Sequence, residues 1–340
     1  MNILAIETSC DETACAVVSD GVHELASVVA SSKELHEATG GVVPEIAARK
    51  QIEFVIPVIE QTLKKISSSV KEVKNSIDAL AVTTGPGLIG SLLVGVEAAK
   101  ALSLAWGKPI VPVNHLMGHI YANFVERGPK KEITFPCAAL VISGGHTDLI
   151  LLRSHGNFDY IGGTLDDAAG ETYDKTARLL GLTKYLGGAE LSKLAATCEK
   201  NLAQGKLPRP MLDQDNFDFS FSGLKTAAKR LIESNRFPVD SVAREFEEAV
   251  GDVVITKTIR AAQKFNCKQI LVGGGVSANQ YLRTRITAEA LEKNVEVLVP
   301  PLDLCTDNAV YIASAAFFNY NPKPFKQIVA NPSLGIMDLA

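Results

Sequence analysis

Residues 138–152, AALVI-SGGHT-DLILL, place a short polar tip between two apolar runs, which is typical of a β-hairpin. Residues 3–18, ILAI-ETSCDET-ACAVV, have the same arrangement. Two glycine-poor apolar runs around a tip of small and polar residues are weak evidence alone, because short hairpins are common in α/β proteins. Their recurrence in both halves of the chain makes a duplicated structure the better hypothesis.

The segments that follow each hairpin strengthen this hypothesis. In the first half, a helix is predicted from Pro44, a strand at 79–82, a glycine loop at 83–87 and a helix at about 91–106. In the second half the same order recurs: a helix from about Ser241, a strand at 269–272, a glycine loop at 273–279 and another helix. The apolar spacing of Ile52, Val55, Ile56, Ile59, Leu63 and Ile66 predicts one buried face for the helix from Pro44.

This repeated order predicts an α/β fold in which two α/β lobes enclose a cleft. We expect an N-terminal lobe at 1–112, with the segment 310–340 packing back onto it, and a C-terminal lobe at 113–309 that includes the H-x-x-x-H pair His115 and His119. Glycine-rich tips allow backbone N–H groups to approach a phosphate, so nucleotide binding in the cleft is a hypothesis. Neither glycine loop matches a P-loop, and the Gly273–Gly275 run is not a dinucleotide-binding fingerprint.

Composition limits the function classes. The chain has 340 residues, 34 Lys+Arg and 38 Asp+Glu, hence a net charge of −4, which disfavours unaided binding of polyanions. Six cysteines without a C-x-x-C pair indicate neither a zinc knuckle nor a disulfide framework. The N-terminus reaches an acidic residue too early for a signal peptide, and Glu97 interrupts the apolar stretch 87–99, so we expect no membrane span and a soluble, cytoplasmic protein.

Two histidines offer a metal site. His115 and His119 are spaced i, i+4, so both imidazoles lie on one helix face if Asn114 caps that helix. Asp307 could supply a carboxylate as third ligand, although a plain helix N-cap is the alternative interpretation of this aspartate. A zinc protease of the H-E-x-x-H type is excluded because the residues between the histidines are Leu, Met and Gly. Iron, zinc and manganese all suit two histidines and one carboxylate.

Eight motifs, in order, resemble the catalytic subunit family of tRNA threonylcarbamoyladenosine transferases over essentially the whole chain. They are ETSCDET (7–13), GGVVPE (40–45), NHLMGH (114–119), SGGHT (143–147), DDAAGETYDK (166–175), FSFSGLK (219–225), GGGVSAN (273–279) and CTDN (305–308). The resemblance implies the fold of actin, sugar kinases and the Hsp70 ATPase. It also implies transfer of a threonylcarbamoyl group from threonylcarbamoyl-AMP to N6 of adenosine 37 in tRNAs that read codons beginning with A.

The resemblance further implies site residues, a cofactor and partners. Its metal ligands correspond to His115, His119 and Asp307, with iron favoured over zinc as the divalent ion. Its adenylate-binding positions correspond to Val141, Ile142, Ser143, Gly144, Gly145, Asp174, Gly188 and Asn279. The expected partners are tRNA, a related, shorter dimerisation subunit and a small P-loop ATPase.

Several points remain open at the level of sequence. Asp11 or Glu12, at the first hairpin tip, could orient or deprotonate the adenine N6 as catalytic groups, or could simply cap the turn. Family members usually have Glu where this chain has Met117, and the Gly-Gly-Pro element of the family appears as Gly187-Gly188-Ala189. The alternative function is a metal-dependent kinase or carbamoyltransferase of the same superfamily that acts on a small molecule.

RNA contacts are predicted only weakly. A series of cations in the second half could form a basic strip, although such charges usually form a solvated helix face. The residues are Lys225, Lys229, Arg230, Arg244, Lys257, Arg260, Lys264 and Lys268.

Overall fold

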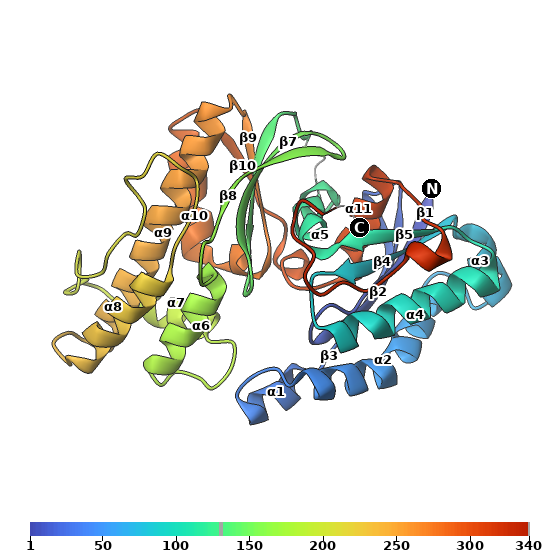
Figure 1. Cartoon of the computed structure of the whole chain (residues 1–340), viewed down its shortest axis with the longest axis horizontal. Helices are drawn as coiled ribbons and strands as arrows, with labels where there is room; N and C mark the ends of the chain where they lie inside the picture. Colours follow the sequence, from blue (N-terminus) through green and yellow to red (C-terminus); the bar gives the residue numbers. More distant parts are fainter. Residues whose placement is uncertain (129–131, 339–340) are drawn as a thin grey trace. The chain divides into compact units, whose positions relative to one another are not determined.

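The computed structural model describes residues 1–128 and 132–338 of the chain (Figure 1). These residues form two compact units, one made of Met1–Glu132 and Pro300–Ala340 and the other of Ile133–Val299. The second unit is therefore one continuous stretch of sequence inserted into the first. Each unit contains one five-stranded sheet.

The first sheet has the strand order β3-β2-β1-β4-β5. Strands β1 (Asn2–Glu7), β2 (Glu12–Ser19) and β3 (His23–Ser31) are successive antiparallel neighbours, whereas β4 (Ala79–Gly85) and β5 (Ile110–Asn114) run parallel to β1. The hairpin predicted at residues 3–18 is confirmed, and β3 extends it by a strand that the sequence analysis did not predict.

Helices cover both faces of this sheet. Side chains alternate between the faces of a strand, and Leu4 and Ile6 pack in one core cluster with residues of α2 (Pro44–Lys64) and α4 (Ile89–Trp106). Helix α11 (Ala309–Phe318) packs on β1 and β2 and also contacts α5 (His115–Tyr121), as Figure 1 shows. The remaining elements of this unit are α1 (Lys33–Thr39), α3 (Val70–Ser76), η1 (Ala122–Phe124), η3 (Leu302–Leu304) and η4 (Phe325–Gln327).

The second sheet has the order β10-β9-β6-β7-β8. Here β6 (Cys137–Ile142), β7 (Thr147–Ser154) and β8 (Asn157–Gly163) are antiparallel neighbours, and β9 (Gln269–Gly273) and β10 (Glu296–Leu298) are parallel to β6. Its helical elements are α6 (Ala169–Leu179), α7 (Gly188–Ala196), α8 (Ser222–Glu233), α9 (Val239–Lys264), η2 (Gly275–Ala278) and α10 (Gln280–Leu291).

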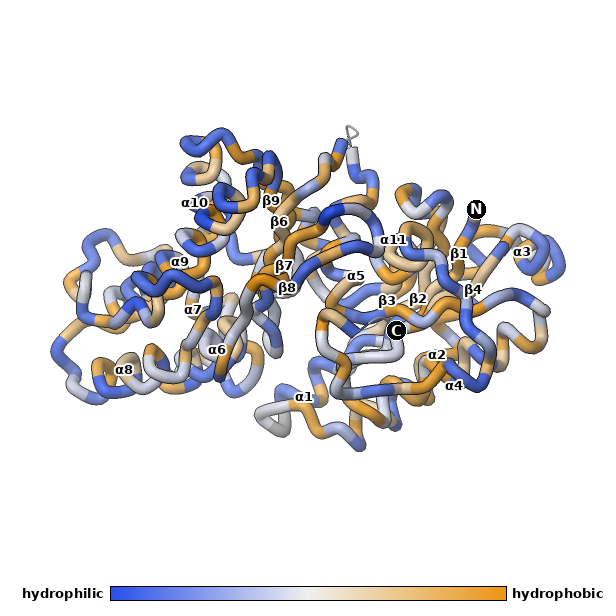
Figure 2. Tube along the Cα trace, turned by 45° about the horizontal axis from the view of Figure 1, so that its top comes forward, coloured by the Kyte–Doolittle hydropathy of each residue, from blue (hydrophilic) through white to orange (hydrophobic). Residues whose placement is uncertain are grey.

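The two sheets have the same topology. In each, three antiparallel strands are followed by two strands parallel to the first, so β1 to β5 correspond to β6 to β10 in order. The central strands of both sheets are mostly hydrophobic (Figure 2). This confirms the duplicated α/β fold. The compact units differ from the predicted lobes in two segments, 113–132 and 300–309, which belong to the first unit. The predicted division after residues 112 and 309 concerns the repeated halves and stays a prediction.

Two expectations about helices are wrong in part. On α2, Ile52 and Ile56 are 63% and 58% exposed, because Ala47, Gln51, Val55, Val58, Ile59 and Thr62 form the buried face instead. Helix α4 is long and apolar enough to cross a membrane by length and composition alone, despite Glu97. It packs against β4 and α2, although only 28% of it is buried, and a single helix of this kind is weak evidence for a membrane span.

Candidate functional site

The two histidines lie on α5, whose first turn is set by Asn114. This residue ends β5, and its side-chain oxygen accepts a hydrogen bond of 2.9 Å from the backbone N–H of Leu116, so the predicted N-cap is confirmed. The rings of His115 and His119 therefore lie on one helix face, with centroids 4.6 Å apart. Both side chains are buried.

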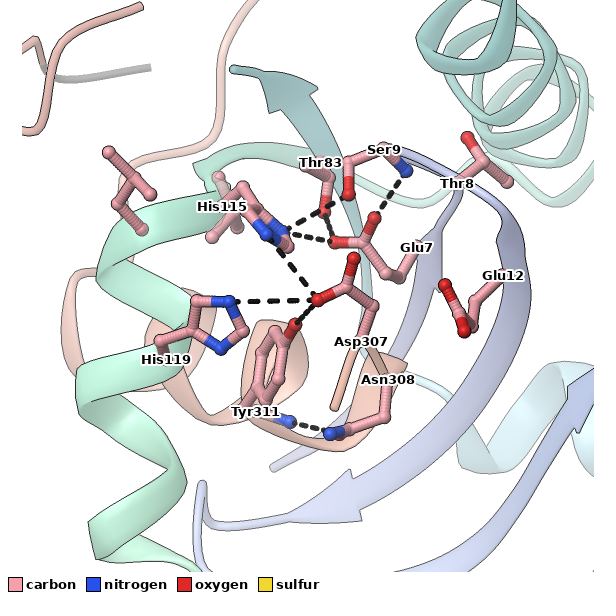
Figure 3. Close-up of polar contacts among 12 residues, drawn as sticks. Glu7, Thr8, Ser9, Glu12, Thr83, His115, His119, Asp307, Asn308 and Tyr311 are labelled. Carbon is pink, nitrogen blue, oxygen red and sulfur yellow. Dashed lines mark hydrogen bonds and ion pairs between the residues drawn. The ribbon is translucent and has the colours of Figure 1, made fainter. Parts of the chain in front are cut away.

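Asp307 joins them from the segment that precedes α11 (Figure 3). Its Oδ1 lies 3.6 Å from Nε2 of His115 and 3.6 Å from Nε2 of His119. The N-cap of α11 is Asn308, whose side chain accepts from the N–H groups of Val310 and Tyr311. The alternative interpretation of Asp307 as the helix cap is therefore wrong, and its carboxylate faces the histidines.

These three residues could hold a metal ion, since one ligand atom from each lies within 4.8 Å of the others. Two ligand atoms at about 2.1 Å from a tetrahedral ion are about 3.4 Å apart, close to the spacing observed here. The donor set of two imidazole nitrogens and one carboxylate also suits iron, zinc or manganese. The residues present thus fit the divalent ion that the resemblance implies.

Buried charges surround these side chains. Burial alone would lower the pKa of His115, but the carboxylates of Asp307 and Glu7 outweigh it and raise this pKa to about 9. Burial raises the pKa of Asp307, with the charge of His115 opposing the effect and those of Glu7 and Asp11 adding to it. Negative charge gathered around two imidazoles is an environment that favours a bound cation.

Glu7 is a site residue that the sequence analysis quoted in a motif but gave no role. It is fully buried at the end of β1, and its carboxylate accepts hydrogen bonds from Ser9 and Thr83 and contacts His115. Burial alone would raise its pKa, but His115, Thr83 and Ser9 outweigh burial and lower it. No sequence signal pointed to this contact, because it depends on the pairing of β1 with β4.

The two acidic residues of the first tip, Asp11 and Glu12, lie in the same unit as the histidines. Asp11 is buried, and Glu12 begins β2. Burial raises the pKa of Glu12 to about 10, helped by the charges of Asp307 and Asp11, so its carboxyl holds a proton at neutral pH in the absence of a cation. The structure thus brings both acids into the electrostatic environment of Asp307.

In the second unit, the tip between β6 and β7 carries the expected phosphate-binding residues. Val141 and Ile142 are buried in β6, whereas Gly144 and Gly145 are exposed, with open space where a Cβ atom would lie. A Cβ atom on Gly274 would approach the carbonyl oxygen of Ile142 to 2.5 Å, so the second glycine loop lies directly against the end of β6. The tip and this loop therefore share one end of the sheet.

Asp174, Gly188 and Asn279 make hydrogen bonds that connect neighbouring helices. The carboxylate of Asp174 on α6 accepts a 2.9 Å hydrogen bond from the N–H of Gly188, the first residue of α7. The amide of Asn279 donates to Ser192 on α7 and to Glu247 on α9, while its oxygen caps α10 through Leu282. Glu247 is buried and was not predicted from the sequence.

The predicted basic strip is wrong in part. Lys257 is fully buried and donates to Asn216 and to the backbone of Asp218. Lys225 pairs with Asp167, and Arg260 donates to the carbonyl oxygens of residues 214 and 216. These three cations thus hold loops and helices together.

Comparison with known proteins gives consistent matches. The family model for "TsaD: tRNA N6-adenosine threonylcarbamoyltransferase" matches residues 23–314. The chain is 48% identical to the tRNA N6-adenosine threonylcarbamoyltransferase of Bacillus cereus, over 98% of this chain and 96% of the relative. It is likewise 48% identical to that of Bacillus subtilis, over 93% of this chain and 89% of the relative.

Solved structures show the fold at low sequence identity. HypF from T. kodakarensis matches with a TM-score of 0.63 and 14% identity, covering 94% of this chain and 48% of that one. The (R)-2-hydroxyglutaryl-CoA dehydratase component A of Acidaminococcus fermentans matches with a TM-score of 0.50 and 17% identity, over 96% of this chain and 99% of that one. Together with the repeated topology, these matches show a duplicated α/β fold with one five-stranded sheet in each half.

Proposed function

Because this chain belongs to the family of tRNA N6-adenosine threonylcarbamoyltransferases and is an enzyme of that activity, we propose that its histidine–aspartate group and its glycine-rich tip serve that reaction. The substrate is tRNA. The donor in this proposal is threonylcarbamoyl-AMP: the adenosine N6 forms a bond to the carbamoyl carbon, the bond to the phosphate oxygen breaks, and AMP leaves with that oxygen.

His115, His119 and Asp307 would hold one divalent ion, iron or zinc. A bound ion of this kind supplies Lewis-acid polarisation of a carbonyl or phosphate oxygen. The support is the convergence of three ligand atoms within 4.8 Å, together with the carboxylates that accumulate negative charge there. Activation is needed because the lone pair of an adenine amine is delocalised into the ring.

Gly144 and Gly145 would bind the phosphate of the adenylate through backbone N–H groups. Ser143, whose own N–H donates to the carbonyl oxygen of His146 at 2.8 Å, would fix the shape of this tip. Both glycines are exposed, and the absence of side chains there leaves room for a close approach. Val141 and Ile142 would hold the tip through β6. Asp174, Gly188 and Asn279 would lie beside the nucleoside of the adenylate. The amide of Asn279 donates to Ser192 and Glu247, so this residue connects neighbouring helices there.

Asp11 or Glu12 would orient the target amine, and Asp11 would accept its proton. The support for Asp11 is its burial and its electrostatic interaction with Asp307. Glu12 is half-buried, and because burial raises its pKa to about 10, its protonated carboxyl could orient the amine by donating a hydrogen bond. The proton lost from N6 as the new bond forms would pass to Asp11.

The single observation that carries the metal-dependent proposal is the convergence of His115, His119 and Asp307. The test mixes the protein with its partner subunits, threonylcarbamoyl-AMP and unmodified tRNA, then digests the RNA and weighs the nucleosides. We expect modified adenosine with the wild type and at least a hundredfold less with His115→Ala plus His119→Ala.

The matched control is His23→Ala, which removes an exposed histidine of the same unit, paired with Glu126. This variant should retain wild-type yield. Equal yields from the double variant and the wild type would reject the role of the histidines.

The partners of this proposal are a related dimerisation subunit and a small P-loop ATPase. The exposed face of α2 and the start of α4 suit the first of these. Ile52 and Ile56 on α2, and Ile89 and Leu93 on α4, are 45–63% exposed. The two helices approach each other at Ala48 and Gly90, so these apolar residues lie within about two turns of that contact. Exposed apolar residues gathered in this way favour a protein interface.

Size-exclusion chromatography of the two mixed proteins tests this surface. Ile56→Glu should prevent co-elution with the dimerisation subunit, whereas Val239→Glu, at an exposed apolar position on α9, should not. Co-elution of both variants would place the partner elsewhere.

We further propose that the enzyme acts in the cytoplasm, where its tRNA substrate is found. The alternative, a small-molecule kinase or carbamoyltransferase, has no support among the close relatives, which share the tRNA activity.

A further inference from the structure

The buried carboxylate of Glu7 has an unusually complete set of donors. The backbone N–H of Ser9 and the hydroxyl of Thr83 each donate to it at 2.5 Å, one to each oxygen. The oxygen that accepts from Thr83 also lies 3.1 Å from Nδ1 of His115 (Figure 3). Burying a charged group costs free energy unless that group is paired and hydrogen-bonded. These contacts therefore explain how the fully buried carboxylate of Glu7 is accommodated.

Because of this contact, the two ring nitrogens of His115 face different carboxylates. Nδ1 faces Glu7, with the hydroxyl of Ser9 at 3.3 Å, whereas Nε2 faces Asp307 at 3.6 Å. A neutral histidine that donates Nδ1–H to a carboxylate has its lone pair on Nε2, so when a metal displaces the second proton of His115, Nε2 is the nitrogen that binds it. The ring cannot rotate without giving up this bond.

We propose that Glu7 is a positioning residue that fixes the tautomer and orientation of His115 for metal binding, and that Thr83 holds Glu7 in place. This inference rests on the proposed metal site at His115, His119 and Asp307. It adds two residues, on β1 and β4, that would act on the metal site through His115.

The test measures metal affinity in the absence of tRNA and partners. The dissociation constant for Zn²⁺ is obtained by competition with a chromogenic chelator for the wild type, Glu7→Gln and Thr83→Val. Loss of such outer carboxylates typically weakens metal binding by about 10–100-fold, which we expect for Glu7→Gln. Thr83→Val keeps the shape of the side chain but removes one donor to Glu7, so a smaller weakening is expected.

Thr84→Val is the matched control. Thr84 is the next residue of β4 and equally buried, but its hydroxyl donates to the backbone of Val113 and not to Glu7. It should bind Zn²⁺ within about twofold of the wild type. Bound Co²⁺ provides a second readout, because a changed His115 orientation should shift the visible ligand-field band of Glu7→Gln at saturating metal.

The outcomes separate the two proposals. If the wild type binds neither Zn²⁺ nor Co²⁺, the metal site itself is rejected. If the wild type binds while Glu7→Gln and Thr83→Val bind as tightly, the positioning role is rejected and the metal site stands. Equal losses in Thr83→Val and Thr84→Val would mean a general effect of removing a buried hydroxyl and would also reject it. If Glu7→Gln shows no cooperative thermal transition, the variant is not folded. The Zn²⁺ dissociation constants of Thr83→Val and Thr84→Val are then compared to test the positioning role.

Discussion

Gly118 lies between the two histidines of α5, at the point where this helix touches α11. A Cβ atom there would come within 2.6 Å of the Tyr311 ring and 2.8 Å of Ile312. The Tyr311 hydroxyl donates to Asp307, so a shift of this ring moves the third candidate ligand. The absence of a side chain at position 118 therefore leaves room for the Tyr311 ring, whose hydroxyl donates to Asp307.

Gly118→Ala should lower the free energy of unfolding by about 1–3 kcal/mol, the usual cost of overpacking, and weaken Zn²⁺ binding. Urea denaturation and chelator competition measure the two effects. Gly223→Ala on α8 is the control, because a Cβ atom there meets nothing within 4 Å. An alanine at 118 that left both quantities unchanged would show that α11 is not held by this contact.

Asp148 on β7 gives a pH dependence that is independent of the metal site. Burial raises its pKa to about 6, with the hydroxyl of Tyr160 donating to it and opposing the shift. The unfolded value is about 3.9, so the folded state binds this proton more tightly. The ionised form therefore destabilises the fold, fully above about pH 6 and not below about pH 4.

Asp148→Asn should thus stabilise the protein more at pH 8 than at pH 4.5, by at most about 3 kcal/mol for a shift of two pKa units. Urea denaturation at several pH values measures the difference. Asp159→Asn, on the neighbouring strand and paired with Arg153, controls for loss of a carboxylate from the same sheet. A gain for Asp148→Asn that stayed constant with pH would contradict the assignment.

At the scale of elements, α5 is held at its start by the last described segment of the chain. The amide of Asn114 donates to the carbonyl oxygens of Gly335 and Asp338, at 2.8 and 3.1 Å, while its oxygen caps the helix. Asn331 and Pro332 bond the backbone of the loop at Thr84 and Gly87. The C-terminal segment thus ties together β4, β5 and α5.

Two substitutions separate these roles of Asn114. Asn114→Ser keeps a capping oxygen but lacks the amide group that donates to Gly335 and Asp338, whereas Asn114→Ala loses both the cap and the amide. Each hydrogen bond contributes about 1 kcal/mol, so Asn114→Ser should cost about 1–2 kcal/mol, and alanine about 1 kcal/mol more. Urea denaturation measures both. A serine variant as stable as the wild type would show that hydrogen bonds to the C-terminal segment do not stabilise the start of α5.

These elements also show what sequence alone can predict. The His115–His119 pair and the Asn114 cap were predictable because both depend on spacings within one helical turn. The capping residue of α11 was not, since Asp307 and Asn308 are neighbours and both are good caps; only the structure assigns the cap to Asn308. The buried face of α2 was misjudged because Ile52 and Ile56 fit the apolar spacing and yet lie exposed.

Contacts between distant segments were the least predictable. Glu7 meets Thr83 because β1 pairs with β4, and it meets His115 because α5 follows the next strand of that sheet. Neither pairing leaves a signal in the local sequence. The repeat of the whole topology, in contrast, was visible because each half carries its own hairpin and glycine loop.

At the scale of the whole molecule, the second unit interrupts the first between residues 132 and 300. Its sheet consists only of β6 to β10, and its core cluster is drawn from residues between Ala138 and Val295. The candidate metal ligands His115, His119 and Asp307 lie entirely in the other unit. The second unit therefore has the attributes of an independently folding domain.

A fragment of residues 133–299 should fold by itself, with a cooperative thermal transition followed by circular dichroism. Because its core and sheet are complete, it needs no contact from outside the fragment to bury them. It should not bind Zn²⁺ with the affinity of the full chain, since the three candidate ligands are absent. A fragment of residues 146–299 is the control: it lacks β6, the strand that joins β7 to β9, and should stay unfolded. An unfolded 133–299 fragment would show that the inserted unit depends on the first unit for its stability.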